Sequence, residues 1–405
     1  MLRWLTVAAA GGALAAGAYF LWSSSSVPGS LSLPYVAAAS VASPAALAHA
    51  RLNEGISRLI GLADLLLPVL GALVYARSGP RFVRESAAGR IGTGMLLAML
   101  GFGVIWIAQL ATGSLGLWWQ RHTGSSRVGY LEWAVGNWFA LVPIFLTACL
   151  AVLVTMLLAK PLGDRWWIAG APVFAALVLL AAFIQPFALT GLRSPDATVA
   201  KEAHLAADAR DLAATAHLPR IPIRIQDVDA QTTAPNAETT GIGASRKVIL
   251  WNTLIEDFSS REIRVVLAHE LGHQARGHIW KQVAWFGLLA LPLAWIMARV
   301  TRRRGGLARP EAVPLGILVF TLLAVATAPL QNVVSRHLEA EADWVALQAT
   351  RDPGAAVSLF EGFTTRAAAD PSPPTWSYIL FDTHPTVAQR IAMARAWAAR
   401  NPAQP

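Results

Sequence analysis

The sequence predicts a mainly α-helical integral membrane protein with seven transmembrane helices. Three observations support this fold class. Hydrophobic residues make up 55% of the 405 residues and charged residues only 14%, whereas about 25% of residues are charged in a typical soluble domain. Seven stretches approach the roughly 20 mostly apolar residues that cross about 30 Å of hydrocarbon. Tryptophans stand at several ends of these stretches, as in the aromatic belt of a membrane interface.

The seven predicted spans divide the chain into a membrane part and two polar segments. The first span could instead be a secretory signal peptide with Arg3 as its basic region, but its apolar run is long and no A-x-A site closes it, so a retained span is favoured. The predicted spans are Trp4–Trp22, Ile56–Ala76, Ile91–Thr112, Trp133–Ala159, Trp166–Leu189, Gln282–Val300 and Val313–Val334.

The basic residues of the short loops predict the orientation. With seven spans, the loops on the N-terminal side carry twelve Lys and Arg residues, and the short loops on the other side carry four. Because basic loops stay in the cytoplasm, the N-terminus is expected inside and both polar segments outside. The net charge of +9 is therefore interpreted as a topology signal, and no nucleic-acid-binding motif accompanies it.

The resulting domain prediction has four parts. Residues 1–190 hold spans 1 to 5, residues 191–281 form a soluble segment, residues 282–334 form the hairpin of spans 6 and 7, and residues 335–405 form a second polar segment. An even number of spans separates the two polar segments, so they lie on one side and can pack together. The single cysteine, Cys149, excludes an intrachain disulfide and any multi-cysteine metal site.

Local patterns predict the elements of the first polar segment. Residues 246–252 are rich in apolar and β-branched residues and predict a strand, and residues 232–243 before them predict a loop or an edge strand. Ser259 and Glu262 form a capping box that opens a helix, expected to continue through His278. In the tail, residues 335–349 and 386–399 predict helices, and residues 23–50 predict an irregular connector.

The decisive motif is His269-Glu270-Leu271-Gly272-His273. On a helix, positions i and i+4 share a face, so both imidazoles can reach one metal ion. Two neutral imidazoles suit Zn²⁺. In H-E-x-x-H peptidases the glutamate acts as general base toward the attacking water.

A catalytic zinc normally has three protein ligands, and the third is not fixed by this motif. His278 is a candidate, but on a continuous helix it would lie about 140° from the face of His273. A carboxylate further along the chain is favoured. Glu339 and Asp343 are spaced i, i+4 on the predicted tail helix, so one can bind the metal while the other holds a histidine N–H.

The ordered motifs resemble the zinc-dependent CAAX prenyl protease type 1 family, a group of integral membrane metallopeptidases whose bacterial relatives include HtpX-like peptidases. The resemblance covers about residues 236–391. Four elements carry it: Asn236-Ala237, the helix 262–278 with its H-E-x-x-H motif, the pattern from Ser335 to Asp343, and His384-Pro385 with Arg390. It implies a zincin-like metalloprotease domain formed by the segment before span 6 and the C-terminal tail.

The resemblance also implies roles for individual residues. It makes His269, His273 and Glu339 the ligands of one Zn²⁺ per chain and Glu270 the general base. Asp343 becomes a partner of His269, Arg390 orients the acidic helix, and His384 donates to the oxyanion. Asn236 and Ala237 would begin an edge strand that binds an extended substrate by backbone pairing.

The predicted function is that of a membrane-embedded zinc metalloendopeptidase in a multi-pass chain of the bacterial cytoplasmic (inner) membrane. Its expected partners are the lipid bilayer and a peptide or protein substrate, lipidated or membrane-associated. Two alternatives stay open: an HtpX-like quality-control peptidase without prenyl specificity, and a zinc-binding membrane scaffold or transporter. The charge pattern favours an extracytoplasmic catalytic side, whereas the family's catalytic side faces the cytoplasm.

Overall fold

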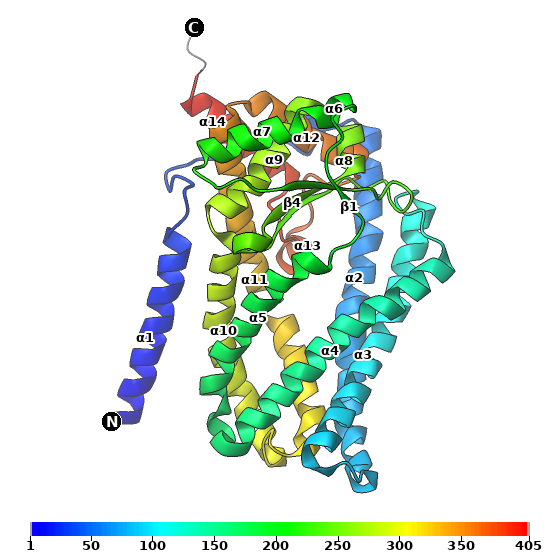
Figure 1. The fold of residues 1–405 in the computed structure, drawn as a ribbon, viewed down its shortest axis with the longest axis vertical. Helices are drawn as coiled ribbons and strands as arrows, with labels where there is room; N and C mark the ends of the chain where they lie inside the picture. The colour runs from blue at the N-terminus through cyan, green and yellow to red at the C-terminus, as the bar shows by residue number, and fades with distance from the viewer. Residues whose placement is uncertain (1, 403–405) are drawn as a thin grey trace.

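The computed structural model describes residues 2–402 and shows a mainly helical protein with a small mixed domain at one end of a long helical region (Figure 1). The long helices are α1 (Leu2–Ser23), α2 (Pro44–Ser78), α3 (Gly89–His122), α4 (Tyr130–Leu162), α5 (Trp166–Ala188), α10 (His278–Thr301) and α11 (Val313–Thr350). Helix α1 begins toward the end of the helical region that is remote from this small domain.

Five helical segments of the described chain are long and apolar enough to cross a membrane. One of them, Tyr130–Ala188, has 59 residues and contains both α4 and α5. Large apolar side chains on these segments are exposed, for example Leu131 and Phe139 on α4, as expected for helices that face lipid. The chain is thus an integral membrane protein. The other segments are Pro44–Val83, Gly89–His122, His278–Arg304 and Pro310–Thr350.

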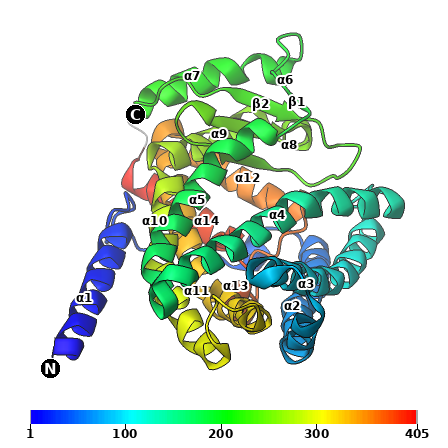
Figure 2. The same cartoon turned by 60° about the horizontal axis from the view of Figure 1, so that its bottom comes forward.

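Helix α1 lies apart from α2 and α3 and beside α10, as both views show (Figure 2). At Gly17 a side chain would approach Leu288 of α10 to 3.2 Å, so the missing side chain permits close packing of the two helices.

Helix α2 begins earlier than the sequence analysis predicted, so the irregular connector expected over residues 23–50 is wrong from Pro44 onward. Ser43 caps the helix by accepting a hydrogen bond from the Ala46 N–H at 3.3 Å. The added turns are stabilised by tertiary contacts that the local pattern does not contain. Glu54 accepts from the Asp370 N–H at 2.7 Å, and Arg58 pairs with Asp370 at 3.3 Å.

The small domain contains a four-stranded sheet in the order β1-β2-β4-β3. Strand β4 (Lys247–Trp251) confirms the predicted strand. It pairs in parallel with β2 (Ile223–Gln226) and antiparallel with β3 (Ala237–Thr240), with Ala237 opposite Leu250. Strand β1 (Leu192–Arg193) pairs with β2 at the other edge. Strand β3 is therefore an edge strand of this sheet.

Helices surround the sheet and close one hydrophobic core. They are α6 (Ala200–Ala203), α7 (Leu205–Thr215), α8 (Asn252–Asp257), α9 (Ser260–Ala275), α12 (Pro353–Arg366), α13 (Thr375–Leu380) and α14 (Val387–Arg400). The apolar sides of α7, α8, α9, α12 and α14 meet the sheet and the end of α11 around buried residues such as Ile225, Leu250, Leu267, Leu347 and Ile391. Burial of this apolar surface fixes α9 against α11. The two polar segments of the chain thus share a single core.

The close packing of α2, α3 and α11 against one another can be tested at Gly101 of α3. A side chain at Gly101 would lie 2.5 Å from Ile317 Cδ1 and 2.7 Å from the ring of Tyr75, whose hydroxyl donates to the Leu97 carbonyl. Gly101→Ala is therefore expected to destabilise the protein by about 1–3 kcal/mol through overpacking. The thermal unfolding midpoint in detergent measures this effect. At Gly103 on the same helix nothing lies within 4 Å, so Gly103→Ala is the matched control, and equal midpoints would contradict the packing.

Candidate functional site

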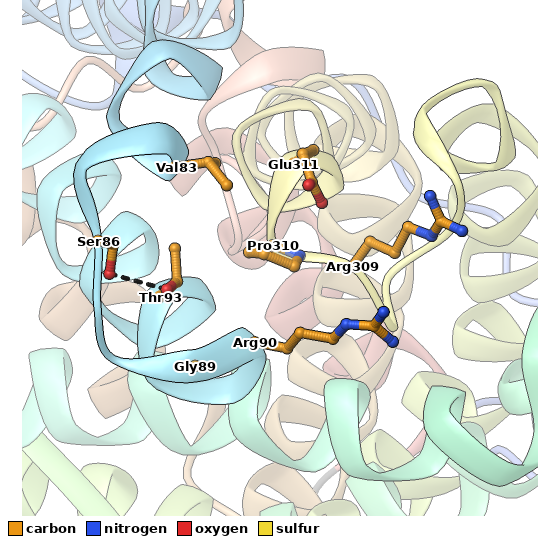
Figure 3. Close-up of a pocket in the computed structure, with 8 residues that line it drawn as sticks. All are labelled: Val83, Ser86, Gly89, Arg90, Thr93, Arg309, Pro310 and Glu311. Atoms are coloured by element: carbon orange, nitrogen blue, oxygen red, sulfur yellow. Dashed lines mark hydrogen bonds between the residues drawn. The ribbon is translucent and has the colours of Figure 1, made fainter.

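The structure contains two cavities of interest, at opposite ends of the molecule. The larger, about 300 Å³, lies at the end remote from the small domain, between the α2–α3 connection and the start of α11 (Figure 3). Its lining contains one carboxylate, Glu311, and no histidine, so it does not offer the donor set of a metal site. The lining residues are Val83, Ser86, Gly89, Arg90, Thr93, Arg309, Pro310 and Glu311.

The smaller cavity, about 100 Å³, lies in the small domain and is lined by His269 and Glu270 of the H-E-x-x-H motif. Helix α9 supplies His269 and Glu270 to it, α11 supplies Asp343, and β3 supplies Ala237. Its apolar wall comes from α12, α9 and α8. The structure thus brings to one place residues that lie more than 100 positions apart in the sequence.

Three side chains converge beside this cavity as a metal-binding group would require. One ligand atom each of His269, His273 and Glu339 lies within 4.8 Å of the others. The two histidine Nε2 atoms are 3.1 Å apart, and His269 Nε2 is 3.1 Å from Glu339 Oε2. That carboxylate oxygen is buried and has no hydrogen-bond partner among the described residues. Two imidazoles and one carboxylate around a common point fit a tetrahedral metal ion with one open position.

The local sequence explains how α9 presents this face. Ser259 accepts from the Glu262 N–H, and Glu262 accepts from the Ser259 N–H at 2.7 Å, which confirms the predicted capping box. Opposite the metal-binding face, Ile263 and Leu267 are buried in the core. At Gly272 a side chain would meet Val345 and the Ala342 carbonyl at 3.3–3.4 Å, so α9 and α11 pack closely where the site forms.

A buried ion pair holds the first histidine. Asp343 Oδ1 accepts from His269 Nδ1 at 2.9 Å, while Arg390 donates to both oxygens of Asp343 at 2.8 and 2.6 Å. The Arg390 guanidinium also lies 4.3 Å from the centre of the Phe360 ring. This carboxylate fixes the tautomer that leaves His269 Nε2 free for a metal.

The second histidine contacts His278, which would lie on a different face from it if the helix were continuous. The helix expected to continue through His278 ends at Ala275, because Gly277 adopts a left-handed conformation with φ of 61°. The chain turns there and α10 begins at His278, so the 140° separation calculated for a continuous helix does not apply. His278 Nδ1 lies 2.8 Å from His273 Nδ1 and its Nε2 lies 3.1 Å from Glu341. The Gly277-His278 pair was the one local signal of this turn.

Glu270 is buried and lines the cavity together with His269. Burial raises the pKa of its carboxyl above the ordinary value for glutamate. A carboxylate with a raised pKa accepts a proton more readily, as a general base requires.

His384 reaches the site from the loop before α14. Its Nε2 lies 3.3 Å from Glu339 Oε2, and 57% of its side chain is exposed. Arg336 of α11 holds the preceding loop by donating to the carbonyls of Tyr378 and Asp382 at 2.8 and 2.5 Å. The imidazole therefore faces both the metal-binding group and solvent, where a substrate can meet it.

The edge strand β3 borders the same cavity. Asn236 and Ala237 line it, and the Asn236 carbonyl accepts from the Trp251 N–H at 3.0 Å. Gln274 of α9 donates to the Thr239 hydroxyl at 2.8 Å, which fixes β3 relative to the metal-binding helix. Within the described sheet β4 is the one neighbour of β3, so its outer edge can pair with an extended peptide.

Comparisons with known proteins show similarity to metallopeptidases. The model of peptidase family M48 matches residues 199–398. The chain is 30% identical over 262 residues to the uncharacterized metalloprotease YhfN of Bacillus subtilis, which covers 62% of this chain and 61% of YhfN. It is 30% identical over 207 residues to a protease HtpX homolog of Methylibium petroleiphilum, which covers 46% of this chain and 72% of that protein.

The fold is also similar to a solved structure. The crystal structure of S. mikatae Ste24p matches with a TM-score of 0.61 and 18% identity, covering 74% of each chain. This similarity extends beyond the small domain into the long helices. The resemblance to the CAAX prenyl protease family and its HtpX-like relatives is confirmed.

Proposed function

Because this chain belongs to peptidase family M48, we propose that it is a membrane zinc endopeptidase whose metal is bound by His269, His273 and Glu339. The convergence of these three side chains beside buried Glu270 supports the proposal best. Zinc bound there would act as a Lewis acid toward the scissile carbonyl and a water molecule. The scaffold or transporter alternative would require neither a buried base nor a free strand edge at the metal.

The surrounding side chains have distinct proposed tasks. Glu270 takes a proton from the attacking water and passes it to the leaving amine. His384 donates a hydrogen bond to the oxygen that becomes negatively charged on the substrate. Asn236 and Ala237 begin the strand edge on which the peptide lies extended, and Arg390 keeps Asp343 in place behind His269. Hydrogen bonds between main chains depend little on the side chains of the substrate, so the proposed sequence specificity is broad.

Metal removal tests this proposal directly. We expect the purified protein to cleave an unstructured polypeptide, to lose that activity on treatment with a zinc chelator, and to regain it when zinc is added. Elemental analysis of the untreated and chelated protein gives the zinc content. Activity that survives complete removal of zinc would contradict the proposal.

The proposed peptidase could either require a prenyl group on its substrate or cleave without one. The resemblance to CAAX prenyl proteases suggests a lipidated C-terminal peptide, whereas similarity to a protein named protease HtpX homolog favours a peptidase without prenyl specificity. We propose membrane-associated polypeptides as substrates, with no requirement for a prenyl group. Equal cleavage of a farnesylated CAAX peptide and its unmodified form supports this choice, and cleavage of the farnesylated form alone refutes it.

We further propose seven spans, α1 to α5 with α10 and α11, in the cytoplasmic membrane of a bacterium. The basic loops between α2 and α3 and between α10 and α11 lie at the end of the molecule remote from the small domain (Figure 1). The positive-inside rule then places the catalytic side outside the cytoplasm. A reporter enzyme fused after the C-terminus is expected to be active outside the cytoplasm. Activity inside would reverse the assignment, and a fusion after Gly306 is the control for the opposite side.

A further inference from the structure

The two histidines of the proposed metal site are supported from behind in different ways. His269 contacts the carboxylate of Asp343 directly at 2.9 Å. His273 instead faces a second imidazole, that of His278, with the two Nδ1 atoms 2.8 Å apart. Behind His278 lies Glu341, whose side chain is completely buried.

The hydrogen-bonding capacities of these groups determine where the protons lie. An ionised carboxylate only accepts hydrogen bonds, so His278 Nε2, 3.1 Å from Glu341 Oε2, carries a proton and donates it. Neutral His278 then has an unprotonated Nδ1, which can only accept. His273 Nδ1 must therefore be the donor, and this tautomer leaves His273 Nε2 with a free lone pair directed at the metal-binding group.

Glu341 is held in place by charged and backbone donors from three segments. Arg276 donates from Nε at 2.6 Å, Lys281 from Nζ at 2.7 Å, and the Ser26 backbone N–H at 2.9 Å. Arg276 also donates to the Ser24 carbonyl at 2.8 Å. These contacts join the segment after α1 to the turn between α9 and α10. The donors around Glu341 offset the free-energy cost of burying its negative charge, so the carboxylate stays ionised and accepts hydrogen bonds.

We propose that His278 and Glu341 are positioning residues that fix the tautomer and orientation of His273. In this arrangement they are the counterpart of Asp343 and Arg390 behind His269. The proposal rests on the proposed metal site. It adds an outer carboxylate, Glu341, for the second histidine ligand, and this carboxylate acts through the imidazole of His278. Loss of an outer partner of a histidine ligand typically weakens metal binding by about 10–100-fold.

Zinc affinity of the full-length protein in detergent is the first test. His278→Phe keeps a ring of similar size but removes both nitrogens, so its zinc dissociation constant is expected to rise by about 10–100-fold. His278→Gln retains an acceptor for His273 and a donor for Glu341, so it is expected to recover most of the affinity. His204→Phe, at an exposed histidine outside the site, is the matched control.

The visible absorption of the cobalt-substituted protein is the second test, because it reports ligand geometry without requiring activity. The spectrum is expected to change in His278→Phe and to return toward wild type in His278→Gln. If the Phe variant does not fold, His278→Ala with and without added imidazole replaces it, with restored zinc affinity expected on addition. Unchanged affinity and spectrum in the Phe variant, or no recovery with imidazole in the Ala variant, would overturn the inference.

Different results would contradict the proposed peptidase function and the positioning role of His278. A wild-type protein that binds no zinc contradicts the proposed function itself. A wild-type protein that binds zinc and cleaves peptides, together with unaffected His278 variants, contradicts only the positioning role.

Discussion

Replacing Glu270 by glutamine is expected to lower kcat for peptide hydrolysis by about 10²–10⁴-fold, the usual contribution of a general base. The amide keeps the size of the side chain but cannot accept a proton from water. Glu270 does not belong to the group of three converging side chains, so the zinc content should stay at the wild-type level. Turnover of a fluorogenic peptide and elemental analysis of the same sample measure the two quantities together.

The control for this substitution is Glu256→Gln, at an exposed glutamate on α8. It removes the same charge outside the site and is expected to leave turnover and zinc content unchanged. A Glu270→Gln protein that hydrolyses peptides at the wild-type rate would remove Glu270 from the mechanism. A variant that loses its zinc would instead make Glu270 a structural part of the metal site.

Replacing Asp343 by alanine is expected to weaken zinc binding by about 10–100-fold, because His269 loses the acceptor for its Nδ1 proton. The same change leaves Arg390 largely buried without its partner, and breaking a buried pair costs about 3–5 kcal/mol of stability. Zinc titration against a competing chelator and thermal unfolding of the metal-free protein measure the two effects separately.

A double variant distinguishes the two roles of Asp343. Asp343→Ala combined with Arg390→Met removes both charges, so the loss of stability should be smaller than the sum of the single losses. Zinc affinity should stay low in the double variant, since His269 still has no acceptor. Additive losses of stability would show that Asp343 and Arg390 do not stabilise each other in the folded protein. A double variant with wild-type zinc affinity would exclude Asp343 as the partner of His269.

The part of the site that depends on helical periodicity could be predicted from the sequence. The spacing of His269 and His273 predicts a shared face, and so does that of Glu339 and Asp343, because both pairs lie within single helices. The capping box at Ser259 located the start of α9 within one residue. Such features are local, so a single sequence can reveal them.

Features that depend on tertiary contacts were not predictable in the same way. Strands β1 and β2 have two and four residues, too few for a pattern of alternating burial. The place of His278 depends on a left-handed Gly277, and one glycine rarely decides whether a helix ends or continues. Similarly, the partners of Glu341 come from α10, from the turn before it and from the segment after α1, and the spacing of residues along α11 does not indicate them.

The length of α11 determines how far Glu339 lies from the start of that helix. The helix has 38 residues and begins at Val313, so Glu339 lies about 39 Å along its axis at 1.5 Å per residue. The hydrocarbon layer is about 30 Å thick. If α11 crosses it upright from Val313, the proposed metal site lies about 10 Å beyond the layer, within the headgroup region. A membrane-anchored substrate of the proposed peptidase would then need about three extended residues, at roughly 3.3 Å each, between its anchor and the bond that is cut. Polypeptides with shorter spacers are then expected to escape cleavage whatever their sequence.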